Sequence, residues 1–139
     1  MKAKDFLSQI EKLDKLIENK TVEKAQWRSI ATSVTAQLGG ERVQSSGNPQ
    51  KITDAIATYL DLEREINCFL SEQIEKKKDI IGVIEQLNPT EYDVLHKIYV
   101  QYKTLQEVAD KYNRTYSWVT TIHGKALKNV QDILDERGM

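Results

Sequence analysis

Polar side chains gather near the end of the chain, where their types and spacing suit contact with nucleic acid. After residue 115, helical spacing leaves Tyr116, Ser117, Thr120 and Thr121 together on one face. Hydroxyl groups donate and accept hydrogen bonds at base edges and phosphates, while Thr methyl groups and Tyr rings can touch a thymine methyl group. This face is therefore predicted to enter the major groove of double-stranded DNA.

Two short helices are predicted ahead of this face, each marked by capping residues. Asn88 is a favourable N-cap, Pro89 suits the first helical position, and Glu91 lies three residues after the cap. Thr104 and Glu107 have the spacing of a second capping box. The first helix is expected to bury Val94, Leu95, Ile98 and Tyr102, and the second to bury Leu105, Val108, Ala109 and Tyr112.

The connection to the third helix has the features of a tight turn. Asn113 stands where a left-handed backbone is common, and Asn tolerates that conformation better than other non-Gly residues. The small side chain of Ala109 lets two crossing helices approach closely. Thr115 is the predicted cap of the third helix, whose inward positions are Val119, Ile122, Ala126, Val130 and Ile133. These features predict a helix-turn-helix.

The run TLQEVADKYNRTYSWVTTIHGKAL resembles region 4 of the sigma-70 family, which recognises the upstream promoter element. The matching positions are Thr104, Leu105, Glu107, Val108, Tyr112, Thr115, Val119, Ile122, Lys125, Ala126 and Leu127. The resemblance implies that Tyr116, Ser117, Thr120 and Thr121 lie where bases are read, and that Lys125 and Lys128 lie at or near phosphate-contacting positions. The full set expected at the phosphates is Thr104, Arg114, Thr115, Trp118, Lys125 and Lys128.

Departures from the family pattern bear on what this surface reads. Sigma factors place Arg, Glu and Gln in the reading positions, whereas this chain has Tyr, Ser and Thr there. Recognition of the standard promoter hexamer is therefore not expected. Arg114 stands where an aliphatic residue usually packs, and Trp118 stands where a basic residue is common. Because the N-terminal part does not resemble the sigma segment that melts the promoter, a complete sigma factor is not expected either.

The residues before position 88 are predicted to form a helical scaffold, because apolar residues recur there at three- and four-residue steps. The predicted segments are helices at 3–19 and 21–38 that form a hairpin, a mobile loop at 39–50, and one long helix from about 52 to 87. The expected fold class is all-α, with an oligomerisation and scaffold region at 1–87 and a DNA-binding domain, a three-helix headpiece, at 88–139.

A helix from residue 52 to 87 would be roughly 50 Å long and needs a surface against which to bury its apolar face. The N-terminal hairpin can cover part of it, and a second copy in a twofold homodimer is expected to cover the rest. A monomeric three-helix bundle is the alternative. In the loop, Arg42 is a candidate for an arm that contacts DNA or a partner.

The combination of a helical N-terminal part with a region 4-like end is similar to small phage and prophage transcriptional regulators of the ArpU/RinA type. This similarity implies a sequence-specific DNA-binding regulator of phage or prophage late genes. Two alternatives stay open. One is a phage small terminase subunit, which also joins a helix-turn-helix to an oligomerising region. The other is an adaptor that binds RNA polymerase without a DNA specificity of its own.

Composition limits the remaining classes. The net charge of -1 over 139 residues provides no global attraction to nucleic acid, so a DNA-binding surface must be local. No apolar run approaches the roughly 20 residues of a membrane span, and a cytoplasmic location is expected. Cys68, the single cysteine, cannot make the usual zinc patterns with His96 and His123. Without a Gly-rich phosphate loop or a nucleophile set, neither an enzyme nor a cofactor is expected.

Overall fold

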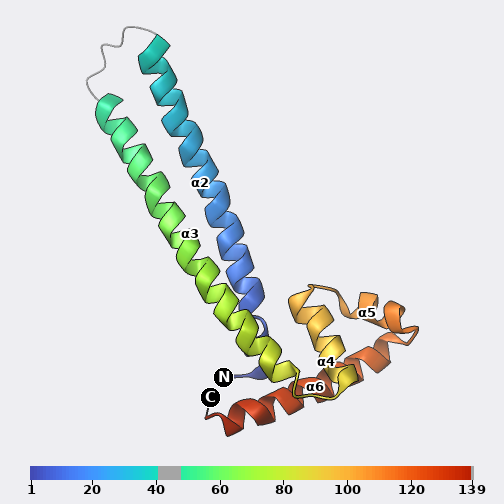
Figure 1. Cartoon of the computed structure of the whole chain (residues 1–139). Coiled ribbons are helices and arrows are strands. Elements are labelled where there is room, and N and C mark those ends of the chain that lie inside the picture. Colours follow the sequence, from blue (N-terminus) through green and yellow to red (C-terminus); the bar gives the residue numbers. More distant parts are fainter. Residues whose placement is uncertain (41–47, 139) are drawn as a thin grey trace. The chain divides into compact units, whose positions relative to one another are not determined.

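The computed structural model describes residues 1–40 and 48–138, and these are helical with short connections (Figure 1). The elements in chain order are α1 (Ala3–Leu7), α2 (Gln9–Gly40), α3 (Asn48–Ile84), α4 (Pro89–Leu95), η1 (His96–Val100), α5 (Leu105–Tyr112) and α6 (Tyr116–Glu136). No strand occurs in these described ranges, so the predicted all-α fold class is confirmed. Among the described residues, no helix is both long enough and apolar enough to cross a membrane.

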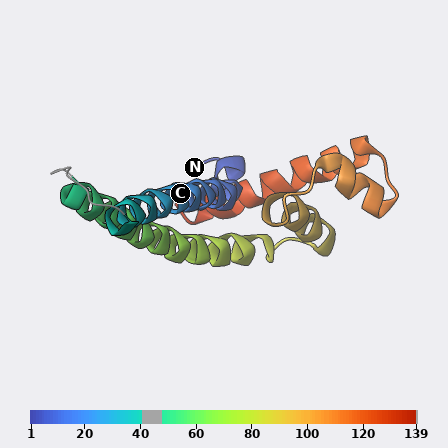
Figure 2. The same cartoon turned by 90° about the horizontal axis from the view of Figure 1, so that it is seen from above.

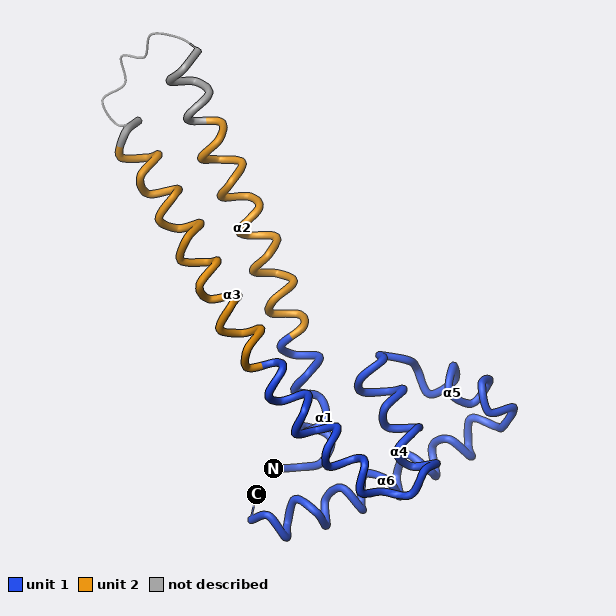
Figure 3. Tube along the Cα trace, in the orientation of Figure 1, with its two compact units in different colours: residues 1–13, 73–139 blue, residues 14–72 orange. Residues whose placement is uncertain are grey.

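The chain divides into two compact units (Figure 3). Residues 1–13 and 73–139 form one, here called the headpiece unit, and residues 14–72 form the other, here called the hairpin unit. This division differs from the predicted boundary at residue 88, because the first residues of the chain and the end of α3 pack with the C-terminal helices. Whether residues 88–139 act as a separate DNA-binding domain stays a prediction.

The hairpin unit contains most of α2 and of α3, which lie side by side and run in opposite directions (Figures 1 and 2). Their less exposed positions recur at alternating steps of three and four residues, the spacing of a coiled coil. These positions are Ile17, Lys20, Lys24, Trp27 and Ala31 on α2, and Ile52, Ala55, Tyr59, Leu62, Ile66 and Phe69 on α3. Both lysines meet carboxylates of α3: Lys20 Nζ is 3.3 Å from Glu65 Oε2, and Lys24 Nζ is 3.5 Å from Glu63 Oε1.

The predicted break between residues 19 and 21 is wrong, because α2 continues through it as one helix. Thr21 does not cap a new helix; its hydroxyl donates to the carbonyl oxygen of Ile17, one turn earlier, at 2.7 Å. The helical hairpin therefore forms between α2 and α3. Of the predicted loop, residues 41–47 with Arg42 lie outside the described residues, whereas residues 48–50 already belong to α3.

The core of the headpiece unit joins segments far apart in the sequence. Phe6, Leu7 and Ile10 are buried together with residues near the end of α3 and along α6. The other buried members of this cluster are Ala3, Ile80, Val83, Ile84, Leu95, Tyr99, Ala126, Val130 and Leu134. Gln131 on α6 also holds the start of the chain, since its Oε1 accepts from the Ala3 N–H at 2.8 Å and its Nε2 donates to the Met1 carbonyl at 3.1 Å.

The segment after α4 widens into a turn of π-helix, η1. The Gln101 N–H donates to the His96 carbonyl at 3.0 Å, and the Lys103 N–H donates to the Lys97 carbonyl at 2.9 Å. Tyr102 takes a left-handed conformation there, with φ of 60°, and its exposure is 44%. The prediction that Tyr102 is buried on the first headpiece helix is therefore wrong, because the helix ends before this residue.

Candidate nucleic-acid interface

The α5 helix begins with the predicted capping box. Thr104 Oγ1 accepts from the Glu107 N–H at 3.1 Å, and Glu107 Oε1 accepts from the Thr104 N–H at 3.1 Å. At α4, the Asn88 side chain accepts from the Glu91 N–H at 2.9 Å, also as predicted. These bonds satisfy backbone donors that a helix start leaves free, so the sequence signals coincide with the observed helix starts.

The turn between α5 and α6 is short and well defined. Asn113 has φ of 54° and ψ of 43°, which confirms the expected left-handed residue. The Arg114 N–H donates to the Ala109 carbonyl at 3.0 Å, and Thr115 Oγ1 accepts from the Trp118 N–H at 3.1 Å as the cap of α6. The angle at which α6 leaves α5 is therefore held by bonds on both sides of the turn.

A second core cluster fastens α4, α5 and α6 to one another. Val94, Val108, Ala109 and Val119 are fully buried in it. Partly buried residues surround them; these are Ile98, Leu105, Tyr112, Trp118 and Ile122. Ala109 of α5 lies in the same buried cluster as Val119 of α6, and its small side chain suits the close approach expected there. This cluster leaves the opposite face of α6 free of core contacts.

The four predicted base-reading residues occupy the first two turns of α6, and all four are exposed. Tyr116 has a relative exposure of 53%. The hydroxyl of Thr120 donates to the Tyr116 carbonyl at 2.9 Å, and that of Thr121 donates to the Ser117 carbonyl at 3.0 Å. Each Thr oxygen keeps lone pairs that can accept from a base, and each methyl group is held in a defined direction. The structure thus groups these side chains on one rigid face.

The predicted phosphate-contacting residues are arranged around this face with different exposures. Thr104, Arg114, Thr115, Lys125 and Lys128 are exposed, whereas Trp118 is half-buried. The Trp118 ring packs against Tyr112, with centroids 5.3 Å apart, and the Arg114 guanidinium lies 5.4 Å from the Trp118 ring centroid. Trp118 therefore contributes to the headpiece core, and it orients Arg114, which keeps an exposed cation at the start of α6.

A polar network inside the headpiece was not foreseen from the sequence. The Asp93 carboxylate on α4 accepts hydrogen bonds from Lys97 Nζ and from the Tyr112 hydroxyl, which joins α4 to the end of α5. Burial raises the pKa of the Asp93 carboxyl, but the bonds from Lys97 and Tyr112 outweigh it and hold the pKa below its ordinary value. Burial, followed by the Asp93 interaction, raises the pKa of Tyr112 to about 12.

His123 follows the reading face on α6 but turns toward the interior. Its Nε2 lies 2.8 Å from the Tyr99 hydroxyl, and the two rings stack with centroids 5.7 Å apart. Burial, and then the nearby charge of Lys4, lower the pKa of His123, while burial raises the pKa of Tyr99 to about 12. The Nε2 atom of His123 is therefore used inside the headpiece unit by the contact with Tyr99.

Comparison with known families agrees with this geometry. Residues 83–132 match the family model described as Sigma-70, region 4. The C-terminal part of the chain is a sigma-70 region 4-like helix-turn-helix. Region 4 is a DNA-binding domain without catalytic activity, and the match includes α4, η1, α5 and most of α6. Searches of curated proteins and of solved structures found no match.

Proposed function

We propose that this protein is a sequence-specific DNA-binding transcriptional regulator that places the first two turns of α6 in the major groove. The observation that carries the proposal is the exposed face of Tyr116, Ser117, Thr120 and Thr121 on a region 4-like helix-turn-helix. These side chains offer hydroxyl groups and methyl groups at the helix start, where recognition helices contact base edges. None of these four side chains belongs to a core cluster, so all four are available to contact DNA.

The phosphate contacts in this proposal come from the rim of the same face. Arg114 and Lys125 supply cations, and Thr104 and Thr115 supply hydroxyl groups near the N-termini of α5 and α6, where backbone N–H groups also favour anions. Trp118 and Lys128 complete the set. Such contacts fix the position of the protein on DNA without reading sequence.

Two copies acting together would strengthen an interaction that a single headpiece makes weakly. From residue 88 to residue 131, six Lys and Arg side chains oppose four Asp and Glu side chains, an excess of two. Because phosphate neutralisation supplies much of the affinity for DNA, so small an excess favours a homodimer that places two headpieces on major grooves about one helical turn apart. The long helix α3 is the proposed means of pairing.

The regulated genes are proposed to be those of a phage or prophage. Support comes from the combination of a long helical part with a region 4-like headpiece whose reading residues differ from those of sigma factors. This organisation resembles that of the ArpU/RinA-type phage regulators, and the change of reading residues suits an operator other than the standard promoter hexamer.

The proposal is tested by selecting bound fragments from sheared genomic DNA of the source organism with the full-length protein. A recurrent sequence motif is expected, and Thr120→Ala should change the preferred base at one position of it. Thr21→Ala is the matched control, because Thr21 is also exposed and also bonds to the carbonyl four residues earlier, but on α2. Failure to retain any DNA, or retention without a shared motif, would overturn the proposal.

Two further readouts separate the proposal from its alternatives. Retention of RNA polymerase by a protein that ignores DNA would identify an adaptor. A ring-shaped assembly that binds a phage packaging site would identify a small terminase subunit. Either result would contradict a transcriptional regulator with its own operator.

A further inference from the structure

A second row of residues, mostly apolar, runs along α3 beside the row that faces α2. The row facing α2 includes Ala55, Tyr59, Leu62, Ile66 and Phe69. One position after each of these residues, and one position after Gln73, come Ile56, Leu60, Glu63, Asn67, Leu70 and Ile74, here called the outer stripe. These residues recur at steps of four, three, four, three and four, so they follow one line along the helix.

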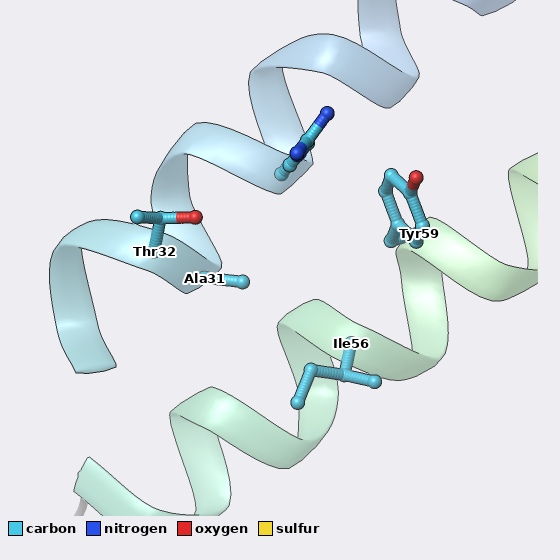
Figure 4. A pocket seen from close by; sticks show the side chains of 5 residues that line it. Ala31, Thr32, Ile56 and Tyr59 are labelled. Carbon is cyan, nitrogen blue, oxygen red and sulfur yellow. The ribbon is translucent and has the colours of Figure 1, made fainter.

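The apolar members of the outer stripe are exposed. Relative exposure is 46% for Ile56, 40% for Leu60, 39% for Leu70 and 53% for Ile74. Ile56 borders a shallow pocket between α2 and α3 that is also lined by Arg28, Ala31, Thr32 and Tyr59 (Figure 4). In a helical hairpin, one row of contacts buries little apolar surface, and further helices are needed for a larger core.

The positions of the outer stripe are symmetric about position 65, and its apolar residue types are symmetric too. Leu60 and Leu70 are equally distant from that position, as are Ile56 and Ile74, and Glu63 and Asn67. A twofold interface requires a surface that complements itself. If two α3 helices lie antiparallel with the axis at position 65, leucine meets leucine, isoleucine meets isoleucine, and the Asn67 amide donates to the Glu63 carboxylate of the second copy.

Charge distinguishes this arrangement from a parallel one. A parallel pair in register would place Glu63 opposite Glu63, and like charges at facing positions repel. In the antiparallel pair each Glu63 meets an amide and keeps its own Lys24, whose Nζ lies 3.5 Å away. Near the axis, Arg64 is bonded to Asp61 of the same helix at 2.9 Å, so this cation already has a partner within its own chain.

We propose that two copies of this chain associate through the outer stripes of their α3 helices, antiparallel and with the twofold axis at position 65. The occupant of the exposed stripe is thus a second copy. This inference rests on the homodimer in the proposed function and adds its surface, orientation and register.

The orientation is tested by disulfide cross-linking in full-length protein with Cys68→Ser as background, since Cys68 is the single cysteine. Leu60→Cys and Leu70→Cys proteins are prepared separately, mixed and oxidised. The expected product is a mixed dimer linking position 60 to position 70. Each variant alone should stay uncross-linked, because identical positions would be about 15 Å apart along the axis, beyond the reach of a disulfide. Efficient cross-linking of either variant with itself would overturn the proposed orientation.

The surface is tested by light scattering on the purified chain. The wild type should have twice the chain mass of 16.0 kDa, and Leu60→Glu and Leu70→Glu should halve the observed mass while keeping the helical circular dichroism. Val22→Glu is the matched control, since Val22 is an apolar residue of α2 with 53% exposure that lies off the stripe. Dimers that persist in both leucine variants would overturn the choice of surface.

Failure of this inference can be told apart from failure of the proposed function. A wild type that is monomeric at micromolar concentration refutes the α3 interface, while the DNA selection still reports whether α6 reads sequence. A dimer that binds no DNA supports the interface and refutes the regulator. If Leu60→Glu is monomeric and selects the same motif with at least tenfold weaker affinity, the result supports both the α3 interface and the proposed regulator.

Discussion

The side-chain amide of Asn129 on α6 donates to both carboxylate oxygens of Glu91 on α4, at 2.8 and 3.1 Å. Glu91 is only 5% exposed, and Asn88 Nδ2 donates to one of the same oxygens at 3.0 Å. A residue that belongs to the N-terminal cap of α4 therefore also joins that helix to α6. The carboxylate is buried, and two side-chain amides satisfy it.

Replacing Asn129 by Ala should lower the free energy of unfolding by about 1 to 2 kcal/mol, because a buried carboxylate then loses its partner on α6. Urea unfolding followed by circular dichroism measures the change. Asn19→Ala is the matched control: Asn19 is an exposed residue within α2, so the helix-propensity gain from Ala is shared. Equal stability of the two variants would contradict a role for the Glu91 contact.

The bond from Tyr112 to Asp93 should stabilise the headpiece in a pH-dependent way. The pKa of Asp93 is lowered in the folded protein, so its contribution is present above the ordinary carboxyl pKa and is lost as pH falls through the folded value. Tyr112→Phe should therefore cost about 1 to 2 kcal/mol at pH 7 and less at pH 3. Chemical unfolding at both pH values measures this. A cost that does not depend on pH would show that the lost hydroxyl acts elsewhere.

His123 should make the protein less stable in mild acid. Burial and Lys4 lower the pKa of His123 from the ordinary 6.5, so the unfolded chain binds the proton more tightly than the folded protein does. Stability is therefore lost as pH falls from above 6.5 toward the lower pKa of the folded protein. Thermal unfolding between pH 7.5 and 5.5 should show this decline in the wild type and a weaker one in His123→Gln. Lys4→Met, which removes the second cause, should give an intermediate slope. Parallel curves for all three proteins would exclude His123 as the source.

The local signals in the sequence were sufficient to predict the helix starts and the turn around the candidate site. Capping residues such as Thr104 and Thr115 act on backbone groups within one turn, and Asn113 meets a backbone requirement at its own position. The exposure of Thr120 follows from helical spacing once Val119 is placed in the core. For these features the physical cause lies within a few residues, so a single sequence is enough to find it.

Features that depend on distant segments were not predictable in the same way. Periodicity showed that Phe6 and Ile10 share an apolar face, but it cannot tell which surface that face meets, and the structure packs it with α6. The pairing of Tyr99 with His123 likewise joins residues 24 positions apart. A helix start was predicted at residue 21, although the Thr21 hydroxyl lies in mid-helix and bonds to the preceding turn.

Lys125 supplies the clearest test of the proposed phosphate contacts. Its side chain is exposed on α6, one turn beyond the four predicted base-reading residues. Lys125→Ala should weaken binding by roughly 5- to 10-fold at 0.1 M salt, equally for operator and unrelated DNA, and should reduce the slope of log affinity against log salt by about one. Fluorescence anisotropy across a salt series measures both quantities. Lys51→Ala on α3, another exposed lysine, should leave affinity and slope unchanged. If Lys125→Ala weakened operator binding alone, Lys125 would be reading a base, and its assignment to the phosphate backbone would be wrong.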